Sequence, residues 1–124
     1  MPTDLDEIQD TLKQFIQQHS PPLRIQKDTK ENFECSGNVE CMQGRKKVDG
    51  MYFASIIPKP KDIRLYFFPI YTHPEAFLLS DDLKKCLKGK SCFHIKKMDE
   101  QLAQKIKEMI DQGVSVYREN QLLE

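Results

Sequence analysis

The chain has 124 residues, of which 39% are hydrophobic and 31% are charged, with seven Phe and four Tyr. This balance is typical of a folded protein and excludes an intrinsically disordered chain, and the length predicts one domain over residues 1–124. Nineteen basic and nineteen acidic residues cancel, which argues against a protein that binds nucleic acid through an overall positive field.

The sequence contains no segment that approaches the roughly 18 consecutive apolar residues of a membrane span. Its start, MPTDLDEIQD, has neither the basic nor the apolar region of a secretory signal peptide. We therefore expect a cytoplasmic protein that does not bind membranes. Thiols stay free in a reducing cytosol, so we expect no disulfide among the four cysteines, which are Cys35, Cys41, Cys86 and Cys92.

Residues 4–18 predict the first helix, because their apolar positions recur at helical spacing. Thr3 is the expected N-terminal cap, and Ser20-Pro21-Pro22 ends the helix, since a proline excludes the helical conformation from the residue before it. Polar and apolar residues then alternate, which predicts strands in antiparallel hairpins. These strands are expected at 23–29, 33–36 and 39–43, with a connection at 44–50.

Segments 51–57 and 63–71 are the most hydrophobic in the chain, so we expect them to be the central strands. Residues 78–87 predict a short helix that Gly89 closes, residues 91–95 predict the last strand, and Asp99 caps a long C-terminal helix. The predicted fold is α+β. It has a mostly antiparallel sheet of five to six strands, with the N- and C-terminal helices packed on one face.

The two central strands are apolar on both sides, whereas a sheet that has helices on one face normally alternates apolar and polar residues. Strict alternation places on the side away from the helices the residues Tyr52, Ala54, Ile56, Tyr66, Phe68 and Ile70. Something must cover this second face. The cover could be segment 72–82 of the chain itself, a partner chain or a ligand.

We therefore predict a non-enzymatic binding module that engages a small molecule or a protein partner through this aromatic face. A homodimer is one form that such a partnership could take. Polar tips at the edge of the face would orient the ligand. The residues expected to bind it are Tyr52, Arg64, Tyr66, Phe68, Tyr71, Cys92 and His94.

The stretch KGKSCFHIKK, residues 88–97, resembles the end of a phosphate-binding loop. Such a loop requires a glycine at the position of Lys84 and leads from a strand into a helix, whereas here a helix precedes a strand. Cys92 and His94 share one side of that strand, but two ligands are too few for a zinc site. An enzyme with Cys92 as nucleophile is a second alternative, which requires a lowered thiol pKa. No catalytic residue is assigned.

Acidic residues line one side of the first helix, at Asp4, Glu7 and Asp10. Carboxylates at this spacing could hold a hard or borderline cation weakly. Acids are also common in a first helical turn, because the positive end of the helix dipole favours them there. The basic clusters at 45–47 and 84–97 are typical of solvated faces and of protected sheet edges.

The run from Met51 to Tyr117, with FFPIYTHPE, LKKCLKGKSCFHIKK and DEQLAQKIKEMIDQGVSVYRE, resembles the YdhG-like family, a bacterial domain of unknown function. The resemblance covers the C-terminal half well and residues 1–50 poorly. It implies a bacterial cytosolic α+β domain, and for some relatives a frataxin-like role as an iron carrier has been proposed. Frataxin-like proteins present acids along their first helix. The first alternative function is therefore a weak iron carrier that uses Asp4, Glu7 and Asp10, with iron as the cofactor.

Overall fold

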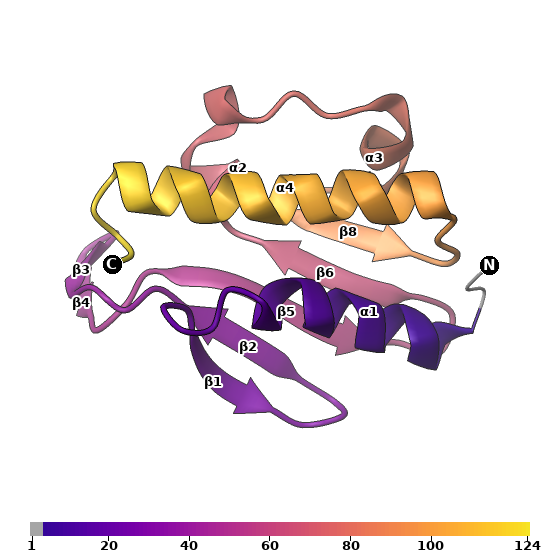
Figure 1. The fold of residues 1–124 in the computed structure, drawn as a ribbon, viewed down its shortest axis with the longest axis horizontal. Coiled ribbons are helices and arrows are strands. Elements are labelled where there is room, and N and C mark those ends of the chain that lie inside the picture. The colour runs from indigo at the N-terminus through magenta and orange to yellow at the C-terminus, as the bar shows by residue number, and fades with distance from the viewer. Residues whose placement is uncertain (1–3) are drawn as a thin grey trace.

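The computed structural model describes residues 4–124 (Figure 1). The elements in chain order are α1 (Leu5–Gln17), β1 (Arg24–Asp28), β2 (Phe33–Ser36), β3 (Cys41–Gln43), β4 (Lys46–Val48), β5 (Tyr52–Pro58), β6 (Ile63–Phe67), α2 (Pro69–Thr72), η1 (Pro74–Ala76), α3 (Asp81–Cys86), β7 (Leu87–Lys88), β8 (Cys92–Ile95) and α4 (Glu100–Glu119). The predicted cap Thr3 lies outside the described residues. Asp4 is the N-cap of α1, and its carboxylate accepts a hydrogen bond from the backbone N–H of Asp6 at 2.9 Å.

Six strands form one antiparallel sheet in the order β1-β2-β5-β6-β8-β7. Helices α1 and α4 lie side by side across one face of this sheet (Figure 1). The predicted α+β fold is therefore confirmed, including the placement of both terminal helices on one face. All four cysteines are free. No helix within residues 4–124 combines the length and the apolarity that are needed to cross a membrane.

The hydrophobic core fills the space between the sheet and the two terminal helices. Its centre is a group of aromatic rings in which Phe53 meets Phe67 and Tyr117 edge to face, with ring centroids 5.6 Å and 5.3 Å apart. All three residues are fully buried. Burial of each such side chain contributes about 1.5–3 kcal/mol, so this group is a main source of stability. The C-terminal end of the chain also joins the core, through Leu123.

A β-bulge in β5 corrects the predicted alternation of its side chains. Cys35 of β2 pairs with Ala54, but the next residue, Ser36, pairs with Tyr52, so Phe53 is an extra residue in β5. A bulge turns two successive side chains toward the same face. Phe53 and Ala54 consequently both point to the helices, where they are fully buried.

The same shift moves the rest of β5. Ile56 lies opposite the buried Leu65 and is itself buried, whereas Ile57 lies opposite Arg64. The prediction that Ala54 and Ile56 face away from the helices was therefore wrong, and the second face is less apolar than strict alternation suggested.

Strand β6 ends earlier than predicted, at Phe67. Pro69 opens α2, because a proline suits the first turn of a helix and cannot donate to a strand ladder. Ile70 and Tyr71 therefore belong to α2 and not to a central strand, and Ile70 is buried in the core.

Two hairpins also differ from the prediction. Residues 41–43 do not join the main sheet but pair with β4 as a separate two-stranded sheet, and Gly44, with φ of 64°, makes the turn. Gly89, with φ of 74°, lies in the turn between β7 and β8. It does not close α3, which ends at Cys86. The predicted order of helix followed by strand in this stretch is confirmed.

Segment 72–82 does not cover the second face of the sheet. The ring of Phe77 packs edge to face on that of Phe67 with centroids 5.5 Å apart, and the side chain of Gln112 in α4 donates to the carbonyl of Ala76. The segment therefore lies on the helix side, beside α4 (Figure 1). Segment 72–82 is therefore excluded as the cover of the second face, and a partner chain or a ligand is left.

We expect Gly113→Val to destabilise the fold by about 1–3 kcal/mol, because overpacking of a dense core has this cost. A Cβ atom at Gly113 would lie 2.6 Å from Cζ of Phe67 and 3.3 Å from Cε1 of Phe53. Urea unfolding would measure the loss. Ser115→Val is the matched control, since Ser115 is exposed on the same helix. Equal midpoints for the two variants would contradict the close contact between α4 and the sheet.

Candidate functional site

We call the face of the sheet that is turned away from α1 and α4 the open face. Residues that lie directly opposite each other in an antiparallel pair share a face. Tyr66 lies opposite both Ser55 and Cys92, and Arg64 lies opposite His94. Because Leu65 and Phe67 between them are buried under the helices, Arg64, Tyr66, Cys92 and His94 are on the open face.

Three aromatic rings continue this surface from Tyr52, the first residue of β5, into α2. The ring of Tyr52 lies 5.4 Å from that of Phe68, and the ring of Phe68 stacks on that of Tyr71 at 5.5 Å with an angle of 28° between the ring planes. Tyr71 is 50% exposed, and the ammonium group of Lys90 lies 5.6 Å from the centre of its ring. The end of this aromatic row is therefore an accessible ring beside a cation.

The seven residues that the sequence proposed for ligand binding form two adjoining groups, which are the aromatic row of Tyr52, Phe68 and Tyr71 and the sheet residues Arg64, Tyr66, Cys92 and His94. The hydroxyl of Tyr52 donates to Oγ of Ser55, which lies opposite Tyr66, so the aromatic row and the row of Arg64, Tyr66 and Cys92 meet. Burial raises the pKa of Tyr52 to about 12. Its hydroxyl is therefore neutral and used within the protein, and Tyr52 contributes its ring rather than a free polar group.

Asp62 is a residue of this site that sequence reasoning missed. Its carboxylate is 8% exposed and lies 3.2 Å from Nε of Arg64 and 3.7 Å from Nδ1 of His94. The hydrogen bond to Asp62 raises the pKa of Arg64. The buried carboxylate therefore fixes the guanidinium of Arg64 by a charge-assisted hydrogen bond and has the imidazole of His94 close by, at a distance longer than a hydrogen bond. No local pattern marks Asp62, because it is the last residue of the loop segment PKPKD, directly before β6, where acids are normally solvated.

Cys92 does not have the environment of an activated nucleophile. Burial raises the pKa of its thiol, and the hydrogen bond from Tyr66 and the charge of Arg64 do not reverse this. The thiolate, which is the reactive form, is therefore scarce at neutral pH. The second alternative, an enzyme that uses Cys92, gains no support from this geometry.

The acids proposed as iron ligands lie away from the open face. Asp4, Glu7 and Asp10 are exposed on α1, and Asp4 uses its carboxylate to cap that helix. Among residues 4–124, no three side chains of the His, Cys, Asp or Glu type gather closely enough to hold a metal ion. Iron binding by these acids stays a prediction.

No known family, no curated protein and no solved structure matches this chain. The resemblance to the YdhG-like family therefore stays a prediction, and the function must be argued from the geometry of the open face.

We expect iodoacetamide to alkylate Cys92 several-fold more slowly at pH 7.5 in the folded protein than in urea. The physical reason is the raised thiol pKa, which lowers the thiolate fraction, and the rate should keep rising as the pH passes the ordinary thiol pKa. Peptide mass spectrometry would follow Cys92 separately from the other three cysteines. Faster labelling in the folded state would contradict the raised pKa and restore the nucleophile alternative.

Proposed function

We propose that the protein is a non-enzymatic binding module, and that its open face engages a small molecule with a planar ring and an acidic group. The observation that carries this proposal is the aromatic row Tyr52, Phe68 and Tyr71, which continues the open face from β5 into α2. Rings that stay accessible on a rigid sheet offer stacking area at little cost in conformational entropy.

The charges around the row support an acidic ligand. Lys90 lies beside the accessible ring of Tyr71, and Arg64 and His94 lie beside Asp62 within the same surface. A planar acid could stack on Tyr71 while its carboxylate meets one of these cations. A flat surface of this kind would also suit a protein partner, including a second copy in a homodimer, and the test below separates that possibility.

Neither alternative function is favoured by an observation. The iron carrier rests on the acids of α1, and the enzyme rests on Cys92, whose thiol pKa is raised. A cytoplasmic location also remains part of the proposal, and it is supported by the four free thiols, which a reducing compartment preserves.

We expect saturation-transfer NMR to detect binding of aromatic carboxylates such as naphthoate, and weaker binding of aliphatic acids of equal charge. Tyr71→Ala should weaken this binding by about tenfold, since loss of one stacking contact of roughly 1–1.5 kcal/mol has that effect. Leu78→Ala is the matched control, because Leu78 is a fully exposed apolar residue on the helix side of the molecule.

Equal binding to both variants would overturn the assignment to the open face. Sedimentation velocity of the wild type and of Tyr71→Ala separates the protein-partner alternative. A dimer that Tyr71→Ala dissociates would identify a second copy as the occupant in place of a small molecule.

A further inference from the structure

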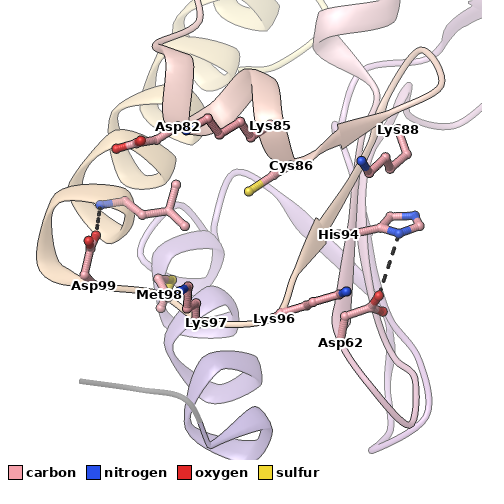
Figure 2. A pocket seen from close by; sticks show the side chains of 11 residues that line it. Asp62, Asp82, Lys85, Cys86, Lys88, His94, Lys96, Lys97, Met98 and Asp99 are labelled. Carbon is pink, nitrogen blue, oxygen red and sulfur yellow. Dashed lines mark hydrogen bonds and ion pairs between the residues drawn. The ribbon is translucent and has the colours of Figure 1, made fainter.

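A cavity of about 770 Å³ opens at the outer edge of the sheet, away from the aromatic row. Strand β7 has only two residues, Leu87 and Lys88, which pair with Phe93 and Cys92. The later residues of β8, His94 and Ile95, therefore have no strand partner on that side. The end of α3 and the start of α4 enclose the space beside this free edge (Figure 2).

The inner wall of the cavity is apolar. Met98 and Leu102 are almost fully buried where they line it, with exposures of 1% and 8%, and Cys86 reaches it from the end of α3. Figure 2 shows the sulfur of Cys86 directed into the space between α3 and the segment that carries Lys96 and Lys97. An apolar wall of this kind can hold the hydrocarbon part of a ligand.

The rim of the cavity is strongly basic. Four lysines line it, and they are Lys85, Lys88, Lys96 and Lys97. Within the part of the chain that the structure describes, none of them forms an ion pair. Ammonium groups that crowd around one opening repel each other, and an anion bound between them relieves this repulsion.

Three carboxylates also line the cavity, and two of them make contacts of their own. Asp62 is engaged by Arg64 and His94, and Asp99 accepts the N-cap hydrogen bond from the backbone N–H of Leu102 at 2.8 Å. Asp82 is the remaining carboxylate of the lining. The lining therefore has four ammonium groups against three carboxylates, and one of these carboxylates, Asp62, is also paired with Arg64.

We propose that this cavity binds a small amphiphilic anion. Its phosphate or carboxylate head lies among Lys88, Lys96 and Lys97, and its hydrocarbon part lies against Met98 and Leu102. The volume fits a small ligand, since such sites usually measure about 300–1,000 Å³. The concave shape of the site and the absence of net charge on the whole chain favour a small molecule over nucleic acid, which needs an extended basic surface. This site does not use the aromatic row on which the proposed function rests, although His94 and Asp62 line the cavity and also belong to the open face.

Isothermal titration calorimetry with octyl phosphate and with octanoate, both below their micelle concentrations, tests the proposal and separates the two head groups. We expect at least one of them to bind, with an affinity that falls as salt is added. Inorganic phosphate, which lacks the hydrocarbon part, and octanol, which lacks the charge, should each bind at least tenfold more weakly. Octanol binding as tight as that of both anions would overturn the role of the lysines.

The double variant Lys88→Gln/Lys96→Gln should weaken binding of the preferred anion by tenfold or more. Lys84→Gln is the matched control, because Lys84 is an exposed lysine of α3 that does not line the cavity. These lysines are exposed, so the variants should keep the wild-type circular dichroism. The variant Lys85→Gln/Lys97→Gln repeats the test if the first pair alters the fold. An unchanged affinity in a folded double variant would overturn the proposal.

Methyl NMR of the methionines locates the ligand. The resonance of Met98 should shift on titration. The resonance of Met42, an exposed residue of β3 that does not line the cavity, should not shift. Tyr71→Ala should leave octyl phosphate binding unchanged, so a failure of the open-face proposal and a failure of this one give different results. Absence of both heat and a Met98 shift would overturn the cavity as a binding site.

Discussion

The structure depends on the close approach of α4 to the sheet at Gly113, where the ring of Phe67 takes the space that a side chain would fill. Phe53 and Tyr117 complete this contact with their rings edge to face. The bulge in β5 is what turns Phe53 inward to join them. Tyr52, the residue before it, then carries the aromatic row on the other side of the sheet, and its carbonyl accepts a hydrogen bond from the hydroxyl of Tyr117. The bulge in β5 therefore determines both the packing of the core under α4 and the position of Tyr52 on the open face.

Periodicity in the sequence was enough to predict the two terminal helices, most of the strands and the α+β class, because amphipathic patterns of 3.6 and two residues reflect burial directly. Periodicity could not reveal the bulge at Phe53. The bulge depends on the register between β2 and β5 and on the packing of Phe53 in the core. The end of β6 could have been predicted from the sequence, since Pro69 cannot continue a central strand. The seven proposed ligand-binding residues fall into two adjoining groups, and Asp62, which binds Arg64 and lies near His94, has no sequence signature.

Strand β8 connects the two proposed binding regions. Cys92 and His94 belong to the open face, whereas the outer edge of the same strand borders the cavity beside α3. His94 is shared, because it lines the cavity and also contacts Asp62. A ligand in the cavity that moved His94 would therefore act on Asp62 and, through it, on Arg64.

The brevity of β7 has a further consequence for behaviour in concentrated solution. It leaves backbone N–H and C=O groups of β8 without a neighbouring strand, and such a margin can template the addition of a strand from another molecule. Lys96 and Lys97 follow directly after β8, and like charges brought edge to edge repel each other. The same ammonium groups that would attract a small anion thus also oppose edge-to-edge association, so an anion that neutralises them on binding would weaken this protection against aggregation.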